Sequence, residues 1–191
     1  MIIHDLSYAN YDIHARPLRL EMFDGHTEDW SRFYQQHKSL PRAWNDTVCN
    51  NVVPVCGRSR MRLRKIVLDM AIYFRREFGY DVVPWTTDED ALDTEHRPNA
   101  FLFYAEPSVG GIGVGATCFR WRESYWAMQW AWMHPYARNH GLLSAVWPFF
   151  RSIYGEFDME KPLSKAMEGF LAKQSRLSSL SSQKLSDGGV P

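Results

Sequence analysis

Apolar residues recur at helical spacing in the middle of the chain. Between Met61 and Phe78 they fall at three- and four-residue steps, and most charged residues lie off that stripe. This periodicity predicts an amphipathic helix, which Gly79 can end in the left-handed conformation. A shorter helix is predicted after the capping residue Thr27, with one apolar face formed by Trp30, Phe33, Tyr34 and His37.

From residue 100 onward the pattern changes to short strands. Apolar runs bounded by turn residues predict strands at 100–104, 112–121, 125–133 and 157–160, and helices at 142–154 and 163–173. The order strand, strand, strand, helix, strand, helix is typical of a mixed α/β (α+β) domain with helices flanking a central sheet. Within 125–133, the alternation predicts that three tryptophans share one strand face: Trp126, Trp130 and Trp132.

The remaining segments carry weaker patterns. Residues 14–23 and 80–85 are strand-like, 40–57 is predicted to be a connecting loop, and 86–98 an acidic loop. The serine-rich stretch 174–191 has too few apolar residues to offset the entropy of ordering, which predicts a flexible tail. We therefore expect a single domain at 61–173, an N-terminal extension at 1–60 that packs on it, and a tail at 174–191.

Composition limits the classes of function. Lys and Arg together number 22, as do Asp and Glu, so no net charge favours nucleic acid or an anionic membrane. No stretch approaches the ~20 consecutive apolar residues of a membrane helix. The three cysteines and the lack of a basic, apolar leader predict a soluble cytoplasmic protein with reduced thiols. Cys49 and Cys56 have no second ligand pair at a fitting spacing, so no metal site is expected.

The most specific chemistry lies between the predicted strand 125–133 and the predicted helix 142–154. Here the sequence reads Met133-His134-Pro135-Tyr136-Ala137-Arg138-Asn139-His140-Gly141-Leu142-Leu143. A tight turn into a helix directs backbone N–H groups and the positive end of the helix dipole at one point. Gly141 allows an anion to approach the backbone, and Arg138 can add charge-assisted hydrogen bonds. The turn therefore predicts a site for an anion such as a diphosphate.

This turn resembles the signature of the GNAT superfamily of acyl-CoA-binding N-acetyltransferases, and the resemblance covers about residues 60 to 173. The chain matches at Met133, His134, Pro135, Arg138 and Gly141, while Leu143 stands where a small residue is usual. The resemblance implies that acetyl-CoA is the co-substrate and that its acetyl group passes directly to an amine. It also implies which residues hold the coenzyme: Ala131, Trp132 and Met133 for the pantetheine arm, and Arg138, Asn139, His140, Gly141, Leu142 and Leu143 for the diphosphate.

The catalytic positions depart from the family pattern. Gln129 and Ala127 occupy the places of a general base, and Phe170 occupies that of the tyrosine that protonates the thiolate. Tyr154 is a substitute proton donor if its helix turns it inward. The candidate bases are Glu106, Glu123 and His134, although the family also acts through positioning and water. Three hypotheses stay open: an acetyltransferase, a catalytically inactive acyl-CoA-binding or interaction protein with this fold, and a nucleic-acid-associated protein that uses the basic run Arg58–Lys65.

Two further features bear on partners. The basic run Arg58–Lys65 is either a set of solvated charges or a contact for nucleic acid, an acidic protein or the coenzyme's 3′-phosphate. The resemblance also implies two strands after the last helix, which form one side of the amine site. The serine-rich stretch at that position predicts no strands. Residues 14–23 or a second subunit in a homodimer then supply that wall, or the cleft is open and suits a macromolecular acceptor.

Overall fold

The computed structural model describes residues 26–41, 52–92, 98–105 and 112–186. The chain divides into two compact units, residues 1–159 and 160–191. The first unit contains a sheet with its helices, and the helix predicted at 163–173 belongs to the second. Several features discussed above lie outside the described residues: the strand-like segment 14–23, Cys49, Glu106, residues 42–51 of the predicted loop, residues 93–97 of the acidic loop and residues 187–191 of the tail.

The first unit is built on a five-stranded sheet in the order β1-β2-β3-β4-β5. Its first four strands are antiparallel, and β5 is parallel to β4. This confirms the predicted mixed, mostly antiparallel sheet flanked by helices. The strands are β1 (Val52–Val55), β2 (Asn99–Ala105), β3 (Ile112–Arg122), β4 (Tyr125–Met133) and β5 (Asp158–Met159).

Strand β1 corrects the predicted loop at 40–57. Its residues Val52, Val53, Pro54 and Val55 are all buried, and they pair with β2. The strand was not predicted because it is short and contains a proline. A proline is compatible with β1 because the strand lies at the end of the described sheet order, where one edge needs no backbone donor.

Four helices belong to the first unit: α1 (His26–Gln36), α3 (Met61–Phe78), α4 (Glu89–Leu92) and α5 (Leu142–Tyr154). The bounds of α3 and α5 are the predicted ones, and Gly79 ends α3 in the left-handed conformation with φ 71°. α4 lies inside the predicted acidic loop. Residues 80–85 are not a strand: they form an irregular segment whose Trp85 packs on α3 and donates to the Arg64 carbonyl.

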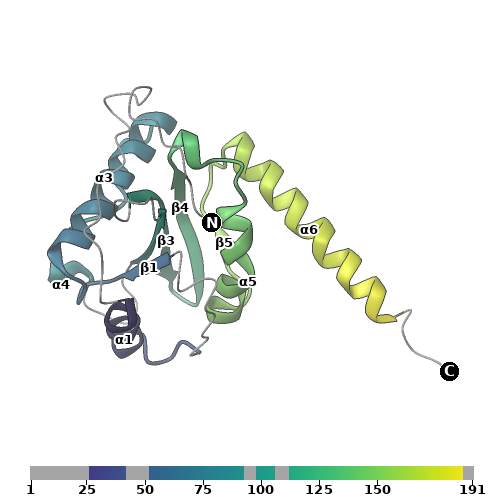
Figure 1. Cartoon of the computed structure of the whole chain (residues 1–191), viewed down its shortest axis with the longest axis horizontal. Coiled ribbons are helices and arrows are strands. Elements are labelled where there is room, and N and C mark those ends of the chain that lie inside the picture. The colour runs from purple at the N-terminus through teal and green to yellow at the C-terminus, as the bar shows by residue number, and fades with distance from the viewer. Residues whose placement is uncertain (1–25, 42–51, 93–97, 106–111, 187–191) are drawn as a thin grey trace. The chain divides into compact units, whose positions relative to one another are not determined.

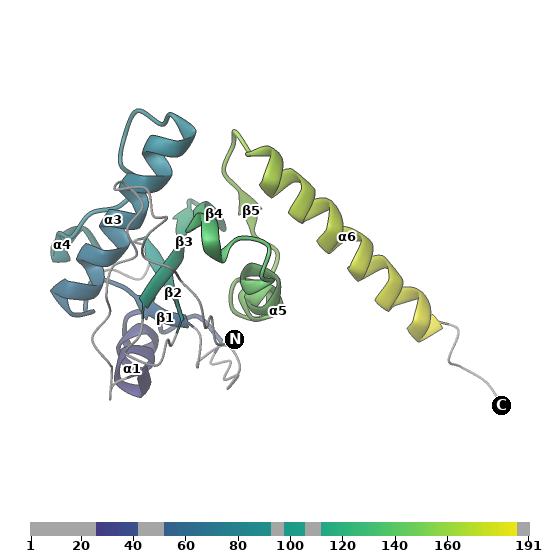
Figure 2. The same ribbon diagram turned by 45° about the horizontal axis from the view of Figure 1, so that its top comes forward.

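The helices cover both faces of the sheet (Figures 1 and 2). On one face, α3 residues such as Leu63 and Val67 pack on Leu102 and Trp130. On the other face, Trp30 of α1 and Phe149 of α5 both contact Phe101 of β2. As a result, both faces of the central strands are buried, and β2 reads as a continuous apolar run rather than an alternating one.

A β-bulge divides the tryptophans of β4 between the two faces. Cys118 is paired with Trp130 but its neighbour Phe119 is paired with Met128, so Gln129 is an extra residue in β4. An extra residue reverses the alternation of side chains. Trp130 and Trp132 therefore pack with α3, whereas Trp126 lies 5.0 Å from the Tyr154 ring of α5. The prediction that all three share one face is wrong.

The second unit contains α6 (Lys165–Ser186), which corrects the predicted flexible tail over residues 174–186. The Ser164 hydroxyl accepts a hydrogen bond from the Met167 backbone at the start of the helix, at 3.2 Å. Serine lowers helix propensity only modestly, and no glycine or proline occurs between residue 174 and Gly188. Within the described part of the chain, no helix combines the length and apolar character needed to cross a membrane.

Candidate functional site at the end of strand β4

The turn that follows β4 has the tight geometry expected from its sequence. Strand β4 ends at Met133, a short 3-10 helix η3 spans Pro135–Ala137, and α5 begins at Leu142. Asn139 and Gly141 both have positive φ, 63° and 76°. Gly141 caps α5 without a side-chain hydrogen bond. The first backbone N–H groups of α5 have no acceptor within the helix, so they are available to an anion.

Gly141 is required by its backbone conformation rather than by crowding. A Cβ atom built on this residue has no other atom within 4 Å. Asn139, His140 and Gly141 are exposed, and Leu143 is partly exposed. The turn therefore presents residues 139–141 to an exposed surface.

Arg138 is engaged inside the protein. Its Nε donates to the Met133 carbonyl at 2.9 Å, and its Nη2 donates to Oε2 of Glu77 on α3 at 2.6 Å. The side chain keeps 37% of its surface exposed. Arg138 therefore ties the turn to β4 and to α3, which is a different use of its charge from the expected contact with a diphosphate.

Glu77 is the functional candidate that the sequence pattern did not reveal. The same oxygen, Oε2, also accepts from Nε1 of Trp132 at 2.8 Å. Burial alone raises the pKa of Glu77, but the hydrogen bonds from Arg138 and Trp132 and the charge of Arg138 outweigh it, so the pKa lies below its ordinary value. The sequence contained one signal for this role. A negative charge in the last turn of a helix is unfavourable next to the negative end of the helix dipole, so Glu77 needs a nearby cation.

The pairing of β4 with its parallel neighbour β5 ends at Met128, five residues before the end of β4. Its pairing with β5 consists of Ala127 with Asp158 and Met128 with Met159. The bulge residue Gln129 follows directly, and its Oε1 lies 3.8 Å from the Cys118 sulfur. Beyond Met128, the described ladder gives the β5-facing side of β4 no strand partner. The predicted pantetheine residues, 131–133, lie in this stretch.

The catalytic candidates lie in different surroundings. Tyr154 does turn inward, but its hydroxyl donates to Asn99 Oδ1 at 2.5 Å and its ring stacks on Phe119. Burial is the main reason that the pKa of Tyr154 lies well above its ordinary value, so the phenol stays protonated. Tyr154 closes α5, roughly 18 Å along the helix axis from Leu142. Phe170 is on α6, in the second unit.

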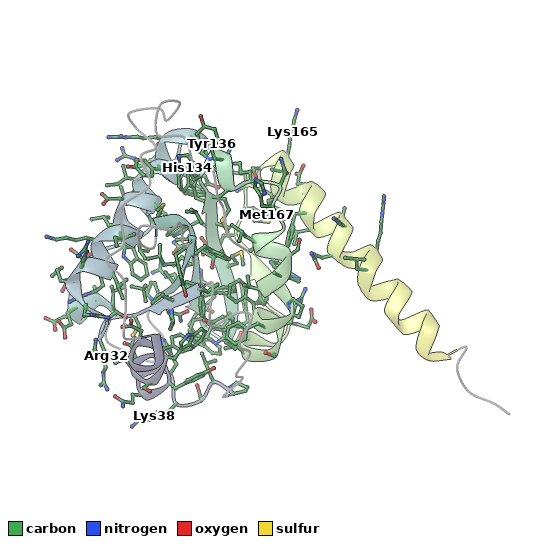
Figure 3. The ribbon with its side chains drawn as sticks, in the orientation of Figure 1. Arg32, Lys38, His134, Tyr136, Lys165 and Met167 are labelled. Carbon is green, nitrogen blue, oxygen red and sulfur yellow. The ribbon has the colours of Figure 1, made fainter. Side chains whose placement is uncertain are left out.

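His134 supports the turn. It is 2% exposed, and its Nδ1 accepts from the Tyr136 backbone N–H at 3.3 Å. The two rings stack with centroids 5.4 Å apart, and they are seen together at the end of β4 (Figure 3). Glu123 is exposed in the turn between β3 and β4, with φ 44°. The predicted coenzyme residues thus form one continuous segment, 131–143, in which His134 is buried, whereas Tyr154 lies at the other end of α5.

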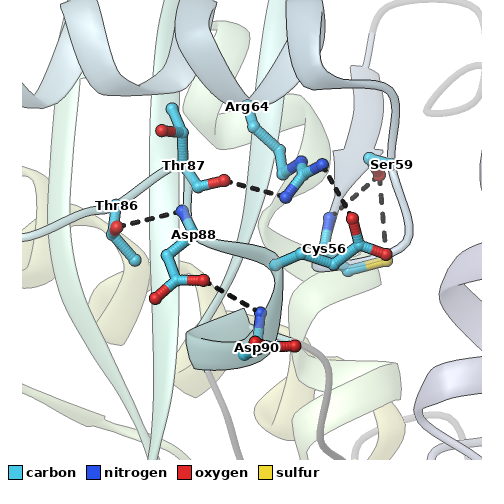
Figure 4. A network of polar contacts seen from close by, with 8 residues as sticks. Cys56, Ser59, Arg64, Thr86, Thr87, Asp88 and Asp90 are labelled. Carbon is cyan, nitrogen blue, oxygen red and sulfur yellow. Dashed lines mark hydrogen bonds and ion pairs between the residues drawn. The ribbon is translucent and has the colours of Figure 1, made fainter.

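Two cations of the basic run are used within the fold. Arg64 is buried and donates to the Thr87 carbonyl at 2.8 Å and to Glu89 at 3.2 Å (Figure 4). Arg60 pairs with the buried Asp29 at 3.5 Å. The structural role of these two side chains explains part of the run without a nucleic acid. The other three are exposed: Arg58, Arg62 and Lys65.

The comparisons with known proteins identify no family for this chain. A scan against protein-family descriptions found no match, and a search of curated proteins found none. Among the described residues, no three His, Cys, Asp or Glu side chains lie together in a way that could hold a metal ion.

Proposed function

We propose that this protein is an acyltransferase of the GNAT type, which moves an acetyl group from acetyl-CoA to an amine. The observation that carries the proposal is that the pairing of β4 with β5 ends at Met128, which leaves this edge of residues 129–133 without a strand partner in the described ladder. Buried backbone N–H and C=O groups need hydrogen-bond partners. The amides of a pantetheine arm supply such partners when they lie along the open edge of residues 129–133, as an added strand does at a sheet edge.

The other end of the coenzyme fits the turn that follows. Strand β4 runs through η3 into the N-terminus of α5, where the exposed backbone of residues 139–141 meets the positive end of the helix dipole. A diphosphate bound there lies next to a pantetheine arm on β4, because the two sites are consecutive in the chain. The strand order and the helix between β4 and β5 also support the resemblance to the GNAT core.

The proposed reaction needs no covalent intermediate on the protein. The amine nitrogen attacks the thioester carbonyl carbon, a C–N bond forms, and the C–S bond breaks as the CoA thiolate leaves. The amine proton passes to water or to one of the candidate bases, Glu106 or His134. The protein contributes by holding the thioester and the amine in contact.

A second candidate is a protein that binds acyl-CoA without transferring the acyl group. The hydrogen bond from the buried Tyr154 hydroxyl to Asn99 favours it, because that phenol is committed to the core. Gln129 and Phe170 favour it as well, since neither side chain exchanges a proton with the substrate at neutral pH.

A calorimetric titration with acetyl-CoA tests the proposal. We expect binding by the wild type and loss of binding in Gly141→Trp, because the indole covers the backbone that holds the diphosphate. Gly155→Trp is the matched control: Gly155 lies at the opposite end of α5, has φ 65°, and also has no atom within 4 Å of a built Cβ. It should bind like the wild type, so any general effect of a strained tryptophan is measured separately.

Transfer is then measured as the release of free CoA thiol in the presence of a panel of small amines and lysine-containing proteins. Thiol release that depends on the amine supports the acyltransferase. Binding without thiol release supports the second candidate. A wild type that binds no acetyl-CoA excludes both.

A further inference from the structure

Glu77 connects three segments that are far apart in the sequence. From the last turn of α3, its Oε2 accepts from Trp132 of β4 at 2.8 Å and from Arg138 of the turn at 2.6 Å. Its partners are 55 and 61 residues away along the chain. One carboxylate oxygen therefore joins α3, the end of β4 and Arg138 within the turn.

The position of Glu77 is not explained by the stability of its own helix. The dipole disfavours a negative charge in the last turn of a helix, and the neighbouring residues Arg75 and Arg76 follow that rule. The cation that compensates Glu77 comes from outside α3, as Arg138. The favourable interactions of the Glu77 carboxylate are therefore those with Trp132 of β4 and with Arg138 of the turn.

The contacts of Arg138 extend the connection. Its Nε donates to the Met133 carbonyl, so the guanidinium bridges the last residue of β4 and Glu77. This bridge closes the segment 133–138, which contains η3. The same carboxylate also accepts the hydrogen bond of Trp132, the residue that precedes Met133. The relative placement of residues 131–133 and of residues 138–141 therefore depends on Glu77.

We propose that Glu77 is a positioning residue of the coenzyme site, an inference that rests on the proposed function. It fixes Trp132 and Arg138 so that the backbone of β4 and the backbone of the turn hold the pantetheine and diphosphate ends of one molecule at a set spacing. The guanidinium of Arg138 acts as a structural brace, and backbone N–H groups hold the diphosphate. Arranging the two ends before binding removes the cost of ordering them upon binding.

The test compares Glu77→Ala and Glu77→Gln with Asp69→Asn. The control removes another α3 carboxylate, one with no hydrogen bond to β4 or the turn among the described residues. We expect acetyl-CoA to bind about tenfold more weakly to Glu77→Ala, since small misplacements of binding groups are costly. Glu77→Gln keeps an oxygen for the Trp132 indole but loses the charge that pairs with Arg138, and should be intermediate. Asp69→Asn should bind like the wild type.

A spectroscopic readout separates positioning from general stability. The indole N–H resonance of Trp132, assigned with Trp132→Phe, should move in Glu77→Ala and stay in place in Asp69→Asn without any coenzyme present. Unchanged acetyl-CoA affinity in both Glu77 variants, with binding still lost in Gly141→Trp, would overturn this inference and leave the proposed function standing. A wild type that binds no acetyl-CoA overturns both, even if the indole resonance confirms the contact.

Discussion

Substitution of Gly115 on β3 tests how closely β3 packs beside the end of β4 in the sheet. Gly115 is the partner of Met133 in the β3–β4 ladder. A Cβ built on Gly115 lies 2.6 Å from the Trp132 carbonyl oxygen and 3.0 Å from the Met133 Cα, and it overlaps the Met133 sulfur. Real Cβ atoms are essentially never found within 3.0 Å of another heavy atom, so Gly115→Ala must displace the backbone of β4.

The same strand provides the control. A Cβ on Gly113 meets side-chain atoms of Met70, Ile66 and Leu102 at 3.4–3.6 Å, which is ordinary contact. Overpacking against a backbone costs about 3 kcal/mol, at the upper end of the usual range. We expect Gly115→Ala to lose that much stability, about 6–12 °C in Tm for a chain of this size. Gly113→Ala should change the free energy of unfolding by less than about 1 kcal/mol in either direction.

Urea denaturation followed by circular dichroism measures both variants, with the slope of the transition checked for a common unfolded state. If Gly115→Ala proves as stable as Gly113→Ala, β4 does not lie against β3 at Met133 as described. The acetyl-CoA affinity of Gly115→Ala adds a second reading, because the displaced residues are those proposed to hold the pantetheine arm.

Three further predictions concern buried or paired polar groups. Tyr154→Phe should cost about 1–2 kcal/mol in urea denaturation, because it leaves the buried Asn99 oxygen without its donor. Arg64→Met should cost about 2 kcal/mol in the same assay, whereas the exposed Arg62→Ala should change stability by less than about 0.5 kcal/mol; equal effects would contradict the buried role of Arg64. The folded-state pKa of Glu77 lies below its ordinary value of 4.5, so its stabilisation is present above that pH and is lost as the pH falls through the lowered pKa. The advantage of wild type over Glu77→Gln should therefore hold from pH 7 to about pH 5 and shrink in more acidic solution, as measured by denaturation across pH.

The features that the sequence predicted correctly depend on local signals. Helix α3 was predicted residue for residue because its apolar stripe ends at Phe78 and Gly79 supplies the left-handed cap. The predicted bounds of α5 also match the structure, where Gly141 precedes the helix with a left-handed backbone and Gly155 follows it with positive φ. The turn between β4 and α5 was found from His134-Pro135 and Gly141, whose conformational limits apply whatever surrounds them.

The features that were missed depend on partners distant in sequence. The extra residue Gln129 is visible only once β3 is paired with β4, so the face of Trp126 could not be read from alternation. Strand β1 is a strand because β2 pairs with it. The ion pair of Arg138 with Glu77 joins residues that are 61 positions apart, so no local sequence pattern contains both of them. Helix α6 continues past residue 173 because nothing in its sequence stops it.

The order of the strands has a consequence for how the sheet assembles. Strands β3 and β4 are joined by two residues and β2 and β3 by six, whereas all of α3 and α4 lies between β1 and β2 in the sequence. Closing a short loop loses less entropy than closing a long one, so contacts local in sequence form faster. We expect the β2–β3–β4 meander to form early and β1 to join it late. In pulse-labelled hydrogen exchange during refolding, the amides of β3 and β4 should then become protected before those of β1, and the proposed coenzyme site would form around a strand that is already in place.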